Sequence, residues 1–359
     1  MTRVHNAAAV GRPFYNNQSP DASRGAISGL PLGGSLTTTL DPDFADITAA
    51  AIRIEPYVRR TPVLRSERLS ELHGGVIDFK CESLQVAGAF KSRGACNAVF
   101  ALSASVATRG VATHSSGNHA AALARAARLR GVPAYIVMPE GAPLVKRAAV
   151  ESFGGIIHEC EATLAAREAA AAGLVHSTGA TLVHPYDDPR VIAGQGTIVL
   201  ELATEVAPPD ALVVPVGGGG LLAGSAIAAR RLWPGTRVVG VEPAGADDAF
   251  RSFTSGVLQS QLAPRTIADG LRGALSPRTL RLARAYADEI VTVGEESIVE
   301  AMRLLFDVLK LVVEPSGAVP LAALLEGKIT ARHVVLVLSG GNVDLTALPW
   351  LGGGHAASR

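Results

Sequence analysis

The stretch VVPVGGGGLLAG, residues 213–224, sets four consecutive glycines between an apolar run and a segment rich in leucine and alanine. The apolar run predicts a buried strand, and the following segment predicts a helix over 221–232. Residues without side chains let backbone N–H groups approach an anion, and a helix N-terminus adds partial positive charge. A tight turn without a ligand is the alternative, but it does not require four glycines. The stretch therefore predicts an α/β fold with a phosphate group at this junction.

After residue 41 the chain alternates short apolar runs with longer amphipathic segments. Strands are predicted at 76–82, 110–115, 132–139, 154–160, 180–185, 211–216, 236–243 and 333–339. Helices are predicted at 91–104, 117–131, 143–154, 161–173, 189–206, 221–232 and 295–311. Strands and helices that alternate at this spacing predict parallel sheets with crossover helices, whose ligands bind at the carboxyl ends of the strands.

Composition limits the classes of function. The chain has 359 residues, 48% of them hydrophobic, and a formal net charge of +1, so no excess positive charge indicates a nucleic acid or an anionic membrane as partner. No apolar run reaches the roughly 18 residues of a membrane-spanning helix. The three cysteines, Cys81, Cys96 and Cys160, form no CxxC-type pair, and we expect buried reduced thiols in a cytoplasmic protein.

The first 41 residues differ in composition from the rest. They are rich in Ser, Thr, Asn, Gly and Pro, which predicts a disordered extension, although their basic, acid-poor composition also fits a transit peptide. Residues 350–359 are expected to form a flexible tail. The basic residues Lys146 and Arg147 fall on a predicted helix, and a solvated helix face explains them.

Two further junctions follow predicted strands, and one lysine stands out. Ser115, Ser116, Gly117 and Asn118 lie at the first junction; helix capping would explain them, but two hydroxyls, an amide and free N–H groups can also hold a carboxylate. The second places Ser339 before two glycines. Lys91 follows an aromatic residue at a predicted helix start, and it is either a solvated charge or an amine held for chemistry.

Lys91 and the three junctions together resemble the fold-type II pyridoxal-phosphate enzymes, in the branch of threonine/serine dehydratases and serine racemases. The matching stretches occur in family order: GAFKSRGA, SSGNHAAAL, VIAGQGT, VGGGGLLAG, VEPAGADD, TIADGLRG, EPSGA and LSGGNVD. The resemblance implies a tryptophan synthase β-like fold with two open, twisted, mostly parallel sheets flanked by helices. It implies a large cofactor-binding domain of residues 42–109 and 188–349, a small domain of residues 110–187, and a homodimer or homotetramer.

The resemblance also implies a role for each matching residue. Lys91 would carry pyridoxal 5'-phosphate as a Schiff base, with Phe90 packed against the ring. The other implied contacts are Asn118 to the ring hydroxyl, Gly217, Gly218, Gly219, Gly220 and Leu221 to the phosphate, Ser339 to the ring nitrogen, and Glu314 and the Gly270 backbone beside the ring. Ser115, Ser116, Gly117 and Asn118 would hold the carboxylate of an amino-acid substrate.

Chemistry favours elimination at such a site. Burial lowers the pKa of a lysine from its ordinary value of about 10.4, so that the free amine of Lys91 can act as a base. A neutral Ser339 hydroxyl would not hold the ring nitrogen protonated, which favours prompt loss of a β-substituent. We therefore expect a lyase that converts a β-hydroxy amino acid, such as threonine or serine, to a 2-oxo acid and ammonia.

Three alternatives stay open. Ser116 would lie on the cofactor face opposite Lys91, and two bases on opposite faces are what a serine or aspartate racemase requires. A β-replacement synthase is disfavoured because SRGA follows Lys91 where that branch has an Asp-Arg pairing. A non-catalytic regulatory protein that binds the cofactor is disfavoured because Lys91, Ser116 and Ser339 are all retained.

The chain departs from the family pattern near the lysine and carries one further motif. Ala87 and Ala89 replace the usual Thr and Ser, and Tyr186 stands where racemases carry a smaller polar residue, which favours a dehydratase. VEPAGADD resembles the family's divalent-cation site. In that reading Glu242 and Asp248 supply carboxylates and Ala246 a carbonyl to Mg²⁺ or Ca²⁺, whereas the alternative is a solvated acidic loop.

Overall fold

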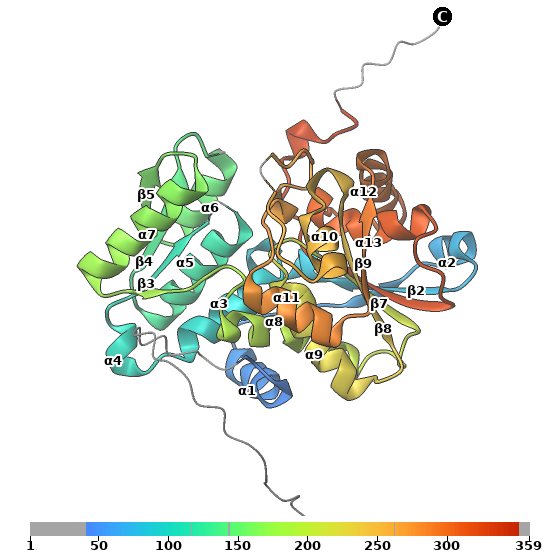
Figure 1. The fold of residues 1–359 in the computed structure, drawn as a ribbon, viewed down its shortest axis with the longest axis horizontal. Helices are drawn as coiled ribbons and strands as arrows, with labels where there is room; N and C mark the ends of the chain where they lie inside the picture. The colour runs from blue at the N-terminus through green and yellow to red at the C-terminus, as the bar shows by residue number, and fades with distance from the viewer. Residues whose placement is uncertain (1–40, 116, 143, 262, 352–359) are drawn as a thin grey trace, which may run out of the picture. The chain divides into compact units, whose positions relative to one another are not determined.

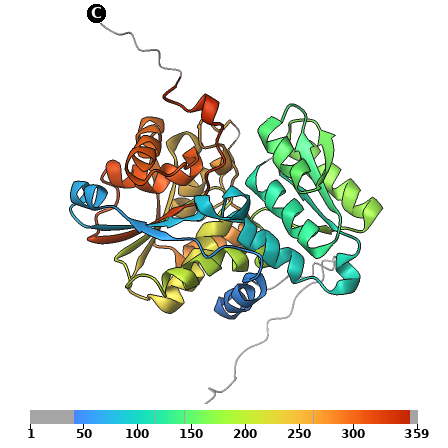
Figure 2. The ribbon, with the colours of Figure 1, turned by 180° about the vertical axis from the view of Figure 1, so that it is seen from behind.

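The computed structural model describes residues 41–115, 117–142, 144–261 and 263–351, which form two sheets (Figure 1). The larger sheet has the strand order β1-β2-β10-β7-β8-β9. Its strands are β1 (Val63–Arg65), β2 (Val76–Cys81), β7 (Ala211–Pro215), β8 (Arg237–Pro243), β9 (Glu289–Val293) and β10 (His333–Leu338). All neighbouring strands run parallel except the antiparallel pair β1–β2. Figure 2 shows from behind the blue strands β1 and β2 at one edge of this sheet, where β2 pairs with β10.

The smaller sheet has the order β5-β4-β3-β6, and its strands are all parallel. They are β3 (Val111–His114), β4 (Ala134–Pro139), β5 (Ile156–Cys160) and β6 (Thr181–Leu182). Helices α5 (Asn118–Arg130), α6 (Leu144–Ser152) and α7 (Leu164–Thr178) surround this sheet. Both sheets belong to one compact unit of the chain.

Helices cover both faces of the larger sheet. Along β7 the side chains alternate, so Leu212 and Val214 belong to one apolar core while Val213 belongs to the other. The first core is covered by α1 (Phe44–Ile54), α8 (Pro189–Leu202), α9 (Gly220–Leu232) and α11 (Pro277–Tyr286). The second is covered by α2 (Glu67–His73), α12 (Glu295–Leu309) and α13 (Pro315–Leu325). Burial on both faces explains why strands such as β7 are apolar throughout.

Helix α3 (Lys91–Phe100) connects the two halves of the fold. It packs against α5 beside the smaller sheet and against α8 beside the larger one. Its middle residues are buried and small, including Gly94 and Ala95, and a Cβ on Gly94 would lie 2.7 Å from the carbonyl oxygen of Val191. The first residue of this central helix is Lys91.

The predicted α/β class with two mostly parallel sheets is confirmed. Several boundaries differ from the predictions: the strand at 180–185 is reduced to Thr181–Leu182, and the helix from 91 ends at Phe100 before α4 (Ala104–Ala107). Helices α1, α2, α10 (Asp248–Ser255), α11 and α13 and strands β1 and β9 were not predicted. The division into a large and a small domain stays a prediction.

The predicted extension of residues 1–41 lies outside the described residues except for Asp41, whose carboxylate pairs with Arg278 and Arg281. Most of the predicted tail, residues 352–359, also lies outside them. Within the described part of the chain, no helix combines the length and apolar character needed to cross a membrane.

Candidate active site

The motif residues gather where strands of both sheets end. Ser339 directly follows β10, the glycine run follows β7 after one residue, and Asn118 follows β3 by four positions. Carboxyl ends of parallel strands share one edge of a sheet, which is the usual position of a ligand site in this class. The structure therefore brings the predicted residues to one region.

Lys91 lies at the centre of this region. Its Nζ donates a hydrogen bond to the carbonyl oxygen of Pro185 at 2.8 Å and lies 4.9 Å from the centre of the Phe90 ring. Burial lowers the pKa of Lys91 to about 8, although the charge of Glu314 opposes this shift. Near neutral pH a much larger fraction of this amine is unprotonated than of an exposed lysine, which is what Schiff-base formation requires.

The backbone before Lys91 is fixed to the end of β10. The N–H of Phe90 donates to the carbonyl oxygen of Ser339 at 3.0 Å, and Ala89 pairs with Gly340 in an antiparallel bridge. Ala87 and Gly88 adopt left-handed conformations, with φ of 58° and 74°. A Cβ on Gly88 would lie 2.1 Å from Oδ1 of Asn342, so glycine is required there.

Asn118, Glu314 and Asn342 form a hydrogen-bonded chain between the two sheets. Asn118 donates from Nδ2 to Oε1 of Glu314 at 2.8 Å, and Asn342 donates from Nδ2 to Oδ1 of Asn118 at 2.9 Å. Glu314 is buried, which raises its pKa to about 8; the charge of Asp269 raises it further and the amide of Asn118 opposes the shift. Glu314 can thus hold or release a proton near neutral pH beside Lys91.

The glycine run forms a close-packed cradle at the start of α9. Gly219 is the helix N-cap with a left-handed φ of 82°. A Cβ on Gly218 would lie 2.2 Å from Cδ1 of Tyr186, and one on Gly217 would lie 3.2 Å from the carbonyl oxygen of Gly270. The junction admits no side chain, and its free N–H groups suit a phosphate. Together with Lys91, this donor set fits pyridoxal phosphate.

The junction before α5, in contrast to the close-packed glycine run, leaves open space at the start of its helix. The N-cap is Gly117, which has no side chain to cap the helix, and Asn118 is the first helical residue rather than the cap. Ser115 accepts the N–H of Gly117 at a long 3.4 Å, and a Cβ on Gly117 would meet no described heavy atom within 4 Å. This space at a helix N-terminus fits a substrate carboxylate. Ser116, the predicted second base, lies outside the described residues.

Burial lowers the pKa of two histidines near Lys91, His119 and His184, and of His114, which contacts His184. His119 is buried, with Nε2 against the carbonyl oxygen of Val183 at 3.2 Å, and burial takes its pKa well below the ordinary value. Burial lowers the pKa of His184 to about 4, and its Nδ1 accepts the N–H of Asp187 at 2.9 Å. The ring of His114 meets that of His184 at 5.1 Å, and burial lowers its pKa as well. These rings therefore add no positive charge beside Lys91.

The predicted cation site contains two buried carboxylates. Glu242 accepts the N–H groups of Ala249 at 3.2 Å and Phe250 at 2.5 Å, whereas both carboxylate oxygens of Asp248 are buried without a hydrogen-bond partner among the described residues. Burial raises the pKa of Glu242 to about 9 and of Asp248 to about 6. The described residues hold no group of three His, Cys, Asp or Glu arranged for a metal. Two carboxylates with the Ala246 carbonyl still fit a hard cation completed by water.

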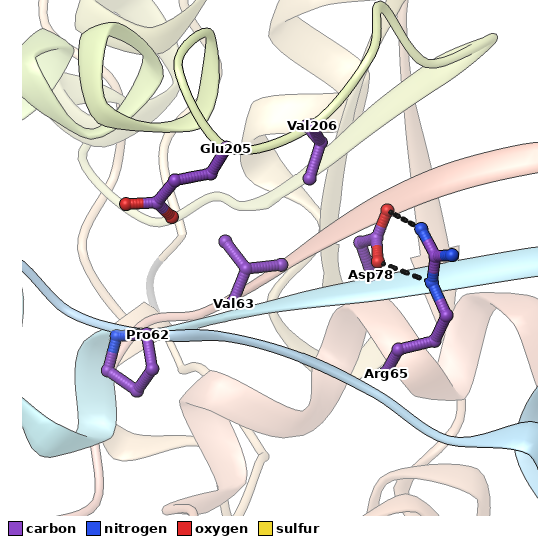
Figure 3. Close-up of a pocket in the computed structure, with 6 residues that line it drawn as sticks. All are labelled: Pro62, Val63, Arg65, Asp78, Glu205 and Val206. Atoms are coloured by element: carbon purple, nitrogen blue, oxygen red, sulfur yellow. Dashed lines mark hydrogen bonds and ion pairs between the residues drawn. The ribbon is translucent and has the colours of Figure 1, made fainter.

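A pocket at the β1–β2 edge lies away from these motifs (Figure 3). It is lined by Pro62, Val63, Arg65, Asp78, Glu205 and Val206. Arg65 faces Asp78 with two hydrogen bonds of 2.9 Å, and His333 makes a third contact with the same carboxylate at 2.8 Å. None of the lining residues belongs to the motifs described above, so the pocket is not part of the candidate site.

Several residues at or near the candidate site were not predicted from the sequence. Asn342 lies in the matched LSGGNVD stretch, but its contacts depend on the approach of Ala87 and Asn118. The Lys146 side chain is partly exposed, as a solvated helix face predicts, but the sequence did not indicate that its ammonium pairs with Asp269 of a distant segment. Pro185 acts through its carbonyl, which no side-chain motif indicates.

The sequence model for pyridoxal-phosphate dependent enzymes matches residues 54–340. The chain belongs to this family. It is 48% identical over 311 residues to the beta-hydroxyaspartate dehydratase of Paracoccus denitrificans, covering 86% of this chain and 99% of that protein. It is 49% identical over 313 residues to the serine racemase of Arabidopsis thaliana, and the match covers 85% of this chain and 95% of that protein. The solved structure of maize serine racemase matches with a TM-score of 0.84 and 44% sequence identity, and the match covers 86% of this chain and 95% of that one. Within the family, the chain is thus an enzyme of the serine/threonine dehydratase and racemase group.

Proposed function

We propose that this enzyme is an ammonia-lyase that dehydrates a β-hydroxy amino acid, with a 3-hydroxyaspartate, serine and threonine as candidate substrates. The observation that carries the proposal is the buried Lys91 amine, whose pKa is lowered to about 8, in a fold that also has a side-chain-free cradle and an open helix N-terminus. The similarity to a beta-hydroxyaspartate dehydratase supports the first substrate. The Tyr186 ring packed against Gly218 supports elimination, since a bulky residue here departs from the racemase pattern.

Each group of residues at the candidate site would have its own role in this reaction. The cradle of Gly217 to Gly220, together with Leu221, would hold the phosphate, and Ser115 with the N–H groups of α5 would hold the substrate carboxylate. Pyridoxal phosphate, when bound, supplies the electron sink that makes the Cα proton removable. Lys91 Nζ would accept that proton, and the neutral hydroxyl of Ser339 would leave the ring nitrogen unprotonated. The β-hydroxyl leaves with a proton, and after hydrolysis the net products are a 2-oxo acid and ammonia.

A divalent cation would be held outside this reaction centre. Glu242, Asp248 and the carbonyl of Ala246 would bind Mg²⁺ or Ca²⁺, which would satisfy the two oxygens of Asp248 that have no hydrogen-bond partner among the described residues. We infer a supporting role for this ion, because its ligands lie between the end of β8 and the start of α10 rather than at the cradle. Cytoplasmic location and assembly into a dimer or tetramer stay predictions.

A serine or aspartate racemase is the second candidate. The serine racemase of Arabidopsis thaliana is as similar to this chain as the dehydratase is. The feature that would favour it is Ser116 as a base opposite Lys91. The two activities differ only in the fate of the substrate after it loses its Cα proton.

One assay separates the candidates. The holoenzyme is incubated with L-serine, L-threonine and L-threo-3-hydroxyaspartate, with Mg²⁺ and with chelator, while 2-oxo acid and D-isomer are both measured. Oxo acid without D-isomer supports the lyase, whereas D-isomer as the main product overturns it in favour of the racemase. Bound cofactor without either product would instead support a regulatory protein.

A further inference from the structure

Lys146 and Asp269 connect the two sides of the candidate site. Lys146 lies on α6, which packs against α5 and β5 of the smaller sheet, and its ammonium pairs with the carboxylate of Asp269. Asp269 begins a 3₁₀ turn, Asp269–Leu271, that packs against α13 beside the larger sheet. The pair therefore joins elements of different sheets.

The Asp269 side of the pair is firmly held. The segment from Arg265 to Leu271 is anchored at its start, where the N–H of Arg265 donates to the carbonyl oxygen of Gly245 at 2.8 Å. It is anchored again where the N–H of Gly270 donates to Oγ of Ser316 at 3.0 Å. Gly270 is also the residue whose carbonyl lies beside the glycine cradle. Asp269 thus occupies a fixed position one residue from the cofactor region.

The Lys146 side is loosely held. Only Val150 of α6 is buried, and Leu144 and Val145 are 81% and 63% exposed. A helix with so little buried apolar surface belongs to the less stable end of a fold. Its position relative to the larger sheet consequently depends strongly on polar contacts such as the one to Asp269.

The pair is also electrostatically connected to the reaction centre. Asp269 raises the pKa of Glu314 and Lys146 lowers it, and the charge of Glu314 in turn raises the pKa of Lys91. Withdrawal of Lys146 would therefore change the charge balance at Glu314. The contacts of Lys146 and Asp269 and their effect on the pKa of Glu314 therefore both connect this pair to the candidate site.

We propose that Lys146 is a positioning residue, and that its ion pair with Asp269 is a latch that holds α6 against the segment beside the glycine cradle and releases to admit the substrate. The side chains of the pair are 31% and 40% exposed. An ion pair this accessible shifts an equilibrium by up to about fivefold and weakens with salt. That strength suits a contact which opens in every turnover, since a much stronger one would hold the site shut.

The test uses the holoenzyme and measures how fast hydroxylamine removes the lysine–cofactor imine, followed by its visible absorbance. Lys146→Gln should accelerate this loss about two- to fivefold and raise KM more than it changes kcat. Lys146→Arg and the charge-exchanged variant K146E/D269K should restore a rate near that of the unmodified enzyme. High salt should accelerate the unmodified enzyme but not Lys146→Gln.

Arg147→Gln is the matched control, because Arg147 is the next residue of α6 and pairs with Glu151 and Glu159 beside the same sheet. Equal hydroxylamine rates for Lys146→Gln and Arg147→Gln would overturn the latch, as would a charge exchange that fails to restore the slow rate. Faster hydrogen exchange of residues 144–152 in Lys146→Gln, measured without cofactor, provides a readout independent of activity. The latch rests on the family's cofactor and not on the proposed substrate, so failure of the lyase assay leaves these measurements interpretable.

Discussion

The side-chain amide of Asn118 donates to the buried carboxylate of Glu314 at 2.8 Å, across 196 positions of sequence. Asn118 begins the first helix after β3, and Glu314 is the N-cap of α13. One hydrogen bond therefore joins a helix of the smaller sheet to a helix of the larger sheet beside Lys91. It also holds a carboxyl whose burial raises its pKa to about 8.

Glu314 should make the cofactor-free protein less stable as pH rises. Its pKa is about 8 in the folded chain and near 4.5 when exposed, so between these values the folded state binds the extra proton. Stability then falls as pH increases through this window and levels off above pH 8. Glu314→Gln should flatten the profile between pH 5 and 8. Urea unfolding midpoints measure this, and an unchanged slope in the variant would contradict it.

Lys91 should react with pyridoxal phosphate at a lower pH than an ordinary lysine. Because burial lowers its pKa from 10.5 to about 8, the rate of imine formation should rise with a midpoint near pH 8. Stopped-flow absorbance of the cofactor-free enzyme mixed with cofactor measures this rate. Glu314→Gln should move the midpoint lower, since the carboxylate raises the lysine pKa. Lys91→Ala should give no imine absorbance at any pH, and survival of that band would refute the assignment of Lys91.

Ca²⁺ or Mg²⁺ should raise the melting temperature through Glu242 and Asp248. Their pKa values are about 9 and about 6, so protons compete with the ion, and the stabilisation should weaken as pH falls below about 9 and be lost below about 6. Thermal unfolding with each ion and with chelator, at pH 8 and pH 5.5, measures the effect. Asp248→Asn should abolish the response. In chelator it should be as stable as the unmodified protein or more so, because it removes a buried charge that makes no hydrogen bond within the described part of the chain.

Gly218→Ala should weaken cofactor binding at least about tenfold, because its Cβ would lie 2.2 Å from the Tyr186 ring and displace it or the cradle. Titration of the cofactor-free protein with pyridoxal phosphate gives the affinity. Gly235→Ala serves as control, since a Cβ there meets nothing within 4 Å. If both variants bind the cofactor equally well, the cradle is not the phosphate site.

Sequence alone determined the elements that depend on neighbours along the chain. Apolar runs with short spacing predicted the parallel strands, and the 217–220 glycines and Ser339 were recognisable because a strand-to-helix junction is a local feature. Lys91 stood out beside Phe90 at a predicted helix start, but its role was predicted only from the resemblance of Lys91 and the three junctions together to a known family. Local patterns of this kind determine the backbone conformation and the type of chemistry.

Only the tertiary structure decided which distant residues meet. Asn342 reaches Ala87 across 255 positions, and Lys146 reaches Asp269 across 123. Neither contact leaves a pattern in the chain, since an exposed lysine and a paired lysine have the same sequence neighbours. The lowered pKa of Lys91 and the raised pKa of Glu314 likewise arise from burial between segments that only folding brings together.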